Sequence, residues 1–238
     1  MGIAYLDTAK GLEEKSEEYR TLAEQYIQLL EKEEAESSMA KDILKKINKA
    51  CAEMVQVVKS EASAQLKKGK LVGLVGGDHS TPLGFIQALA EKYDSFGVLQ
   101  IDAHMDLRKA YEDFEYSHAS ISYNFMKLPQ IEKLVQVGIR DFCEEEYKYA
   151  ERHSDRVTVF YDEAYETFLQ PSFLRSCNAA FPNKIVFVEF HRPTGIRFQW
   201  VRDCVGVLGN DYMFLLKTEY TLSFNTERTD SVLTSCFH

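Results

Sequence analysis

The sequence predicts an α/β fold in which a mostly parallel sheet is covered on both faces by helices and preceded by a helical N-terminal region. Residues 12–68 show apolar positions at helical spacing. After residue 70, short apolar runs alternate with helical stretches. These runs are apolar throughout, which is typical of parallel strands buried on both faces. The chain has 238 residues, of which 45% are hydrophobic, so we expect a single domain over 1–238.

The N-terminal region predicts two or three amphipathic helices. Leu22, Tyr26, Leu29 and Leu30 recur at helical spacing. The serine pair at 37–38 predicts a break, with a serine capping the helix that follows.

The remaining elements follow from the alternation of apolar and helical segments. We expect helices at 82–91 and 144–152. The expected strands are 71–75, 96–101, 134–139, 157–160 and 185–190. Residues 221–238 hold few apolar residues at either period, so we expect a loosely packed C-terminal end.

Composition excludes several classes of partner and location. Lys and Arg total 28 against 37 Asp and Glu, a formal charge of -9, which gives no reason to expect nucleic acid or anionic lipid as partners. A small cationic substrate suits this charge better. No apolar run approaches the roughly 20 residues that span a bilayer, and the N-terminus turns charged early, so we expect a cytoplasmic protein. The five cysteines are scattered and form no C-x-x-C pair, which predicts free thiols.

The first expected strand ends in GGDHS at 76–80. Two glycines permit a tight turn, Ser80 or Thr81 can cap the next helix, and Pro82 suits its first turn. His79 then projects from the sheet edge. Taken alone, a histidine in a turn is more often structural than a metal ligand.

The next strand ends in DAHMD at 102–106. In extended backbone, residues two apart point the same way, so Asp102, His104 and Asp106 can converge. Three ionisable groups at the end of a buried strand are costly unless a divalent cation neutralises them. Imidazole and carboxylate ligands without thiolate favour Mn²⁺, although Zn, Fe or Co can substitute. The alternative is a buried cluster of ion pairs and hydrogen bonds without metal.

With GGDHS and DAHMD in this order, the sequence resembles the ureohydrolases, the family of arginases, agmatinases, guanidinobutyrases and formimidoylglutamases. The resemblance covers about residues 70–190. It implies a three-layer α/β fold and a pair of Mn²⁺ ions that ionise a shared water for attack on a guanidino or formimino carbon. It also implies a homo-oligomer.

The resemblance assigns roles to individual residues. His79 and Asp106 would bind the first metal, His104 the second, and Asp102 both. Asp78 would orient its neighbours. The catalytic residues would be Asp106 and His118, and the histidine would shuttle a proton or position the leaving amine. The alternative for His118 is an ordinary surface-loop histidine.

The family's third motif, a Phe followed by Asp-x-Asp, is altered here. After the strand at 184–188 the chain reads EFHRP, which puts His191 and Pro193 in the positions of the two aspartates. Imidazole can bind Mn²⁺, whereas proline has no side-chain donor. We therefore expect a competent first metal site that includes His191 and a weak or empty second site, unless Glu189 or Asp203 substitutes.

Residues 191–238 as a whole depart from the family pattern, and an altered reading frame or a gene remnant is one explanation.

Two functions remain open. The first is a Mn²⁺-dependent hydrolase of a linear C–N bond in a small cationic guanidino substrate. Agmatine is preferred, because the segment after DAHMD lacks the Asn-containing loop of arginases. The second is a catalytically impaired relative with one metal or none that acts as a binding or assembly subunit.

Overall fold

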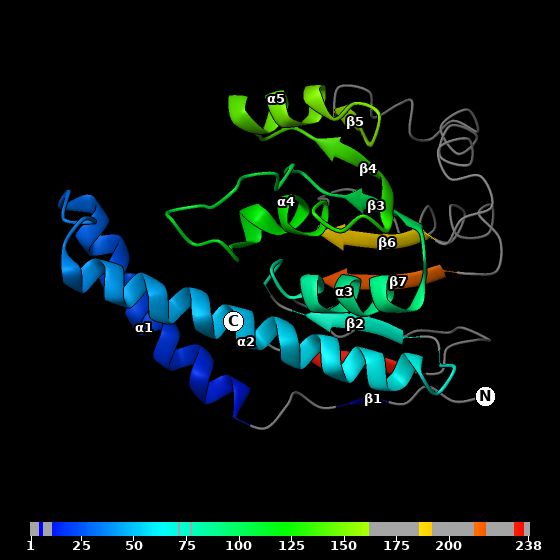
Figure 1. Ribbon diagram of the computed structural model, residues 1–238, viewed down its shortest axis with the longest axis horizontal. Coiled ribbons are helices and arrows are strands. Elements are labelled where there is room, and N and C mark those ends of the chain that lie inside the picture. The colour runs from blue at the N-terminus through cyan, green and yellow to red at the C-terminus, as the bar shows by residue number, and fades with distance from the viewer. Residues whose placement is uncertain are drawn as a thin grey trace.

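The computed structural model describes residues 5–6, 11–70, 72–76, 78–161, 186–191, 212–217 and 231–235 of the chain. In the last three segments it describes the backbone of three strands. Figure 1 shows one sheet whose strands run side by side, with helices in front of it.

Two long helices form the N-terminal region, α1 (Leu12–Glu31) and α2 (Ser38–Leu66). The Ser37 side chain accepts a hydrogen bond from the Ala40 N–H at 3.2 Å, so the predicted break and cap are confirmed. Tyr26 of α1 packs with Ile43 and Ile47 of α2 in a small core of their own. The connected ends of the two helices extend past the ends of the strands (Figure 1).

The sheet has eight strands in the order β1-β8-β2-β7-β6-β3-β4-β5, and every neighbouring pair is parallel. The strands are β1 (Tyr5–Leu6), β2 (Val72–Gly76), β3 (Phe96–Ile101), β4 (Ile131–Ile139), β5 (Val157–Tyr161), β6 (Val186–His191), β7 (Tyr212–Lys217) and β8 (Ser231–Ser235). The five predicted strands are all present. The parallel sheet is therefore confirmed.

Three strands were not predicted, β1, β7 and β8. β8 lies between β1 and β2, so part of the C-terminal segment joins the sheet by its backbone. The packing of the side chains over 221–238 lies outside the described residues.

Four shorter helical elements connect the strands: α3 (Pro82–Lys92), η1 (His118–Ser120), α4 (Ile121–Phe125) and α5 (Glu144–Arg152). The connections from β2 to β3, β4 and β5 all advance across the sheet in one direction, so right-handed crossovers place α3, α4 and α5 on one face. Helices predicted for the other face would fall at 162–185, 192–211 or 218–230, which lie outside the described residues.

Helix α3 packs closely against α2 at Gly84. A Cβ there would lie 2.3 Å from the Val55 carbonyl oxygen, so only glycine fits. Pro82 occupies the first turn of α3 as predicted. The predicted side-chain cap is wrong: Thr81 makes no cap hydrogen bond, and its hydroxyl instead donates to the Asp78 carbonyl at 2.8 Å.

The strand register brings several strand ends to one edge of the sheet. Ile101 of β3 pairs with Phe190 of β6, and Gly76 of β2 pairs with Lys217 of β7. GGDHS and DAHMD follow strands that are consecutive along the chain, but β7 and β6 lie between β2 and β3 in the sheet. The two strands are therefore three interstrand spacings, about 14 Å, apart.

In the part of the chain that the structure describes, no helix is both long and apolar enough to cross a membrane. Cys51 and Cys143 are free and partly buried, as predicted. Cys177, Cys204 and Cys236 lie outside the described residues.

Candidate metal centre

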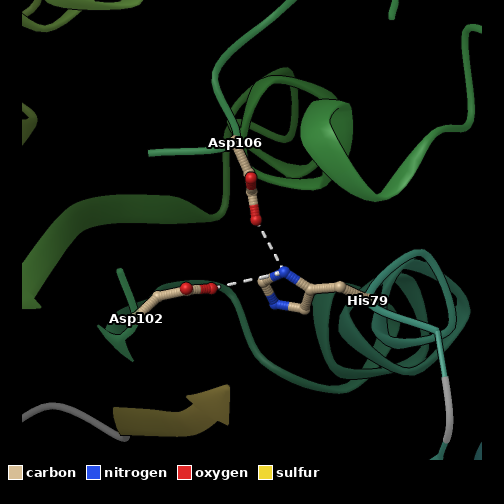
Figure 2. Close-up of side chains that lie close together, drawn as sticks. All are labelled: His79, Asp102 and Asp106. Carbon is tan, nitrogen blue, oxygen red and sulfur yellow. Dashed lines mark hydrogen bonds and ion pairs between the residues drawn. The ribbon is translucent and has the colours of Figure 1, made fainter. Parts of the chain in front are cut away.

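Three buried side chains converge at the carboxyl edge of the sheet (Figure 2). His79 Nδ1 lies 2.6 Å from Asp106 Oδ2 and 3.4 Å from Asp102 Oδ2. One ligand atom from each residue lies within 4.8 Å of the other two. His79 and Asp106 are each 4% exposed and Asp102 is fully buried. We call these three residues the triad.

His79 reaches the triad from the turn that joins β2 to α3. Asp78 shapes this turn, since its carboxylate accepts the Ser80 N–H at 2.9 Å and its carbonyl accepts the Thr81 hydroxyl. Strands β7 and β6 separate β2 from β3, and the turn after β2 therefore has to place the His79 imidazole near the loop that follows β3.

Asp102 and Asp106 converge for a reason different from the one predicted. The strand ends at Ile101 and the chain bends at Ala103, so it does not stay extended. Asp106 has a φ of 53°, in the left-handed region, and this conformation turns its carboxylate back toward His79. The prediction that alternation along an extended chain gathers Asp102, His104 and Asp106 was therefore wrong, and His104 is outside the triad.

His104 lies on the other side of Asp102. Its Nδ1 is 3.4 Å from Asp102 Oδ1, and its backbone N–H donates to the same oxygen at 3.0 Å. Its side chain is 47% exposed, and Nε2 lies 3.8 Å from Asp141 Oδ2. The hydrogen bond to Asp102 raises the pKa of His104, burial opposes this, and Asp106 and Asp141 raise it further. The two oxygens of Asp102 therefore face two different histidines.

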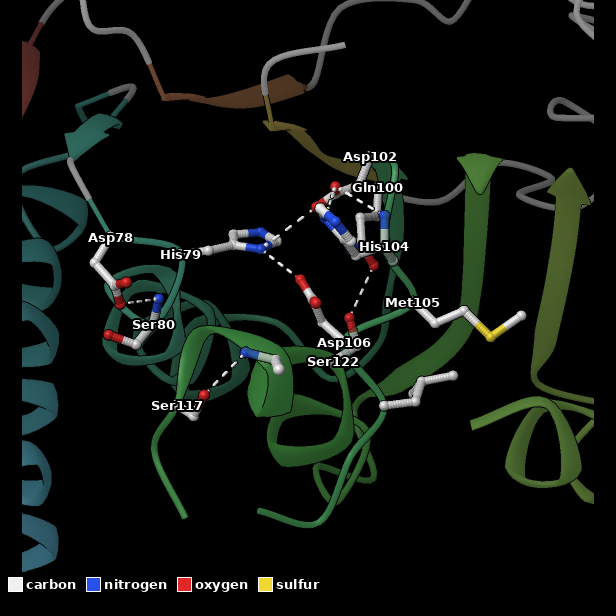
Figure 3. A network of polar contacts seen from close by, with 12 residues as sticks. Asp78, His79, Ser80, Gln100, Asp102, His104, Met105, Asp106, Ser117 and Ser122 are labelled. Atoms are coloured by element: carbon white, nitrogen blue, oxygen red, sulfur yellow. Dashed lines mark hydrogen bonds and ion pairs between the residues drawn. The ribbon is translucent and has the colours of Figure 1, made fainter. Parts of the chain in front are cut away.

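A buried polar network supports this loop, and Figure 3 shows two of its members, Gln100 and Ser122, near Asp102 and Asp106. Gln136 of β4 donates to the Met105 carbonyl at 2.6 Å and to Gln100 Oε1 at 2.8 Å. Ser122 donates to the same Gln100 oxygen at 2.8 Å. Gln100 Nε2 in turn lies 3.4 Å from Asp102 Oδ2. Gln100, Ser122 and Gln136 are buried, and the hydrogen bonds between them fix the backbone that carries Asp102 and Asp106, although Gln136 Oε1 has no hydrogen-bond partner among the described residues.

Glu146 of α5 is a supporting residue that the sequence analysis missed. It is 3% exposed, and its carboxylate accepts the Leu107 N–H at 3.0 Å and the Cys143 N–H at 2.8 Å. Arg108 Nε lies 3.5 Å from the same carboxylate. The only local signal was a Glu at the third position of a helix. Because Cys143 precedes it where a Ser or Thr is usual, that signal was weak.

The other predicted residues have different placements. His118 is exposed at the start of η1, outside the triad, and its ring lies 5.9 Å from that of Tyr111. His191 ends β6, and the pairing of Phe190 with Ile101 puts it level with Asp102. Its side chain lies outside the described residues, as do the side chain of Glu189 and all of Pro193 and Asp203.

The donor set of the triad fits a divalent cation. Two carboxylates face one imidazole, so the buried group keeps a negative charge even when His79 is protonated. Isolated buried charge is costly, and a cation bound between the three donors would offset it. Nitrogen and oxygen donors without thiolate suit Mn²⁺ and related metals.

Comparison with known proteins agrees with this geometry. A family model described as the arginase family matches residues 8–187. The chain belongs to the arginase family. The predicted resemblance to ureohydrolases is therefore confirmed.

Named relatives of this arginase-family chain match part of it. The N(1)-aminopropylagmatine ureohydrolase of Thermus thermophilus is 41% identical over 85 residues, which cover 36% of this chain and 28% of the relative. The agmatinase of Bacillus anthracis is 30% identical over 96 residues, 40% of this chain and 33% of the relative. The matched segments thus cover about a third of the length of these relatives.

Solved structures share the fold. Arginase from Medicago truncatula has a TM-score of 0.59 at 22% identity, covering 71% of this chain and 58% of that protein. The agmatine ureohydrolase of Thermoplasma volcanium has a TM-score of 0.55 at 19% identity, covering 69% and 60%. The predicted fold class, a three-layer α/β fold, is confirmed.

Proposed function

We propose that this arginase-family chain is a Mn²⁺-dependent ureohydrolase that cleaves a linear C–N bond of a small cationic guanidino substrate and releases urea. The observation that carries the proposal is the buried triad of His79, Asp102 and Asp106 at the strand ends. Agmatine is the preferred substrate, which the names of two relatives, an N(1)-aminopropylagmatine ureohydrolase and an agmatinase, and the net charge of -9 support.

The triad residues would hold the first Mn²⁺, with His191 as a further ligand from the end of β6. His104 and the outer oxygen of Asp102 would hold the second. When bound, such a pair of cations lowers the pKa of a shared water and supplies hydroxide near neutral pH. Asp102 suits the shared position because its two oxygens face His79 and His104 separately.

The reaction adds water to the guanidinium carbon and breaks the bond to the substituted nitrogen, giving urea and a protonated amine. Asp106 would act in catalysis as a carboxylate ligand beside His79 that keeps the site negative for a cationic substrate. His118 would carry the proton that the leaving amine requires. Its exposed position suits exchange of that proton with solvent.

A specific observation favours a second candidate, a catalytically impaired relative. Pro193 stands where the family has a carboxylate, and His104 is half-exposed. Such a protein would keep the triad and bind one metal or none, and it would serve as a binding or assembly subunit.

Metal counting combined with a substrate screen separates the two candidates. The protein is purified with Mn²⁺, its metal content is measured by mass spectrometry, and urea or formamide release is assayed with agmatine, arginine, guanidinobutyrate and formimidoylglutamate. Two ions per chain with urea from agmatine supports the hydrolase. One ion or none without turnover overturns the hydrolase and favours the impaired relative.

A double replacement, His191→Asp with Pro193→Asp, tests the alignment of the third motif. Added carboxylates at the end of β6 should raise the metal content toward two ions per chain and raise urea release. No gain in metal content would contradict the alignment of this segment.

The single domain over 1–238, the homo-oligomer and the cytoplasmic location stay predictions. Analytical ultracentrifugation tests the oligomer directly.

A further inference from the structure

The loop at 108–119 joins the metal-centre segment to η1 and carries His118. Its base is closed where the Arg108 N–H donates to the Ala119 carbonyl at 3.2 Å. Its tip is a tight hairpin, in which Phe114 N–H donates to the Tyr111 carbonyl at 2.9 Å and Tyr111 N–H returns a bond at 3.3 Å. The loop is therefore a defined structure with a base and a tip.

The tip requires positive φ angles at two residues that are not glycine, a conformation that is unfavourable for most side chains. Glu112 and Asp113 have φ values of 50° and 62°, in the left-handed region. Two-residue turns of this type favour Asn-Gly or Asp-Gly, because side chains other than these are strained there. Contacts from outside the loop are needed to hold a Glu-Asp tip in this shape.

The N-terminal helices supply those contacts. Tyr26 of α1 is 1% exposed and its hydroxyl donates to Asp113 Oδ2 at 2.8 Å. Asn48 of α2 accepts the Glu115 N–H at 3.1 Å and lies 3.5 Å from the Asp113 carbonyl. The ring of Phe114 packs on Tyr26 with centroids 5.4 Å apart. Both helices therefore contact the tip of the loop and stabilise its conformation.

Tyr111 connects the hairpin, which the N-terminal helices hold in place, to His118. The Tyr111 ring contacts the His118 ring edge-on at 5.9 Å, and the Arg108 guanidinium lies 5.3 Å from the centre of the same ring. Tyr111 is itself the first residue of the hairpin at the tip of the loop. The orientation of the His118 imidazole thus depends on where the hairpin is held.

We propose that Tyr26 and Asn48 are positioning residues, which hold the 108–119 loop so that the His118 ring is fixed relative to the triad. The inference deepens the proposed function and rests on it for the role of His118. It assigns to the helical N-terminal region a part in catalysis at a distance from the metal.

The test uses the full chain with Tyr26→Phe, which removes only the hydroxyl, and Tyr19→Phe as the matched control. Tyr19 packs on the same small core from the same helix. We expect Tyr26→Phe to lower kcat about 10-fold, with KM and Mn²⁺ affinity within about 2-fold of the parent, because a misplaced proton carrier slows chemistry rather than binding. Tyr19→Phe should change neither constant.

Replacements of Asp113 supply the rescue control. Asp113→Asn keeps an acceptor for the Tyr26 hydroxyl and tolerates positive φ, so its kcat should stay within about 2-fold of the parent. Asp113→Ala should match Tyr26→Phe, and the double variant Tyr26→Phe, Asp113→Ala should be no slower than either single variant. Additive losses would overturn the proposed contact.

A measurement without turnover keeps this inference separate from the proposed hydrolase activity. The imidazole resonances of His118 in an NMR spectrum, and amide exchange over 108–119, should change in Tyr26→Phe and stay unchanged in Tyr19→Phe. If the parent protein releases no urea, the hydrolase proposal fails. If the His118 resonances are unchanged in Tyr26→Phe, the proposed positioning role of Tyr26 is overturned. If the parent is active and Tyr26→Phe shows faster amide exchange over 108–119 but the same kcat as the parent, the positioning role is overturned as well.

Discussion

The two sides of Asp102 face very different surroundings. Its Oδ2 lies in a buried group with His79 and Asp106, whereas its Oδ1 faces His104, which is 47% exposed. On the buried side, backbone and side-chain hydrogen bonds fix the positions of the donors before any ligand arrives. On the exposed side, the potential ligands among the described residues are Asp102 Oδ1, the half-exposed His104 and the exposed Asp141, whose Oδ2 lies 3.8 Å from His104 Nε2. The two metal positions that would share Asp102 therefore differ: the buried one has three donors already close together in the fold, and the exposed one does not.

The largest expected difference follows from removing one histidine from each side. His79→Ala should weaken Mn²⁺ binding at the triad by about 100-fold, because a ligand of a preformed site is lost. His104→Ala should leave that affinity within about 3-fold of the parent, since His104 lies outside the triad. Calorimetric titration with Mn²⁺ measures both, and circular dichroism establishes that each variant is folded. Equal losses would contradict the inequality of the two sides.

Removing support beneath the loop should have a smaller effect. Gln136→Leu leaves the buried Met105 carbonyl without its donor and Gln100 Oε1 with Ser122 alone, which should cost about 2 kcal/mol in the free energy of unfolding. It should also weaken Mn²⁺ binding about 10-fold by loosening Asp102 and Asp106.

The matched control is Gln56→Leu on the exposed face of α2, which should change neither quantity. Urea denaturation and metal titration provide the two readings. A Gln136→Leu protein with parental Mn²⁺ affinity would show that the network stabilises the fold without organising the metal centre.

A neutral side chain in place of Asp102 should act in opposite directions on stability and on binding. Asp102→Asn leaves one carboxylate opposite His79, so the metal-free protein should gain about 1–2 kcal/mol because the repulsion between two buried carboxylates is removed. Mn²⁺ should no longer stabilise the protein. Thermal unfolding with and without Mn²⁺ tests both, with the exposed Asp42→Asn as control. A loss of stability in metal-free Asp102→Asn would refute the charge argument.

The buried hydroxyl of Tyr26 extends the comparison to a polar group outside the metal centre. Burial first, and then Asp113 and Glu36, raise the pKa of Tyr26 to about 12. The neutral phenol is therefore favoured in the folded state, so its contribution is complete below pH about 10 and is lost as pH rises toward 12. The parent should lose up to roughly 1.4 kcal/mol more than Tyr26→Phe between pH 8 and pH 11.

Urea denaturation at the two pH values measures this difference. Burial also raises the pKa of Cys51 to about 11, but that thiol is present in both proteins and cancels. Parallel pH dependences would mean that the Tyr26 hydroxyl is not held by the fold.

The sequence predicted the parallel sheet because β2 to β6 are continuous apolar runs between helical segments, and it predicted α2 because Ser37 precedes an amphipathic stretch. Strand order could not be predicted, since the insertion of β7 and β6 between β2 and β3 depends on contacts remote in sequence. The two-residue strand β1 is too short for a periodic signal, and β8 contains only two apolar residues, Val232 and Leu233, between polar ones.

The candidate site was predicted in its residues and not in its geometry. His79, Asp102 and Asp106 were identified from two motifs, but alternation in a strand also grouped His104 with them. The positive φ of Asp106 is set by the loop and its partners, which no spacing rule contains. Glu146 escaped notice because its burial depends on the packing of α5 against the loop rather than on a motif.

Anomalous diffraction at the manganese edge, from crystals of the full chain grown with excess Mn²⁺, tests the central claim most directly. We expect a strong peak in contact with His79 Nδ1 and with a carboxylate oxygen of both Asp102 and Asp106, and a weaker peak or none beside His104. A peak away from the triad, or no peak with the three side chains arranged as in Figure 2, would contradict it.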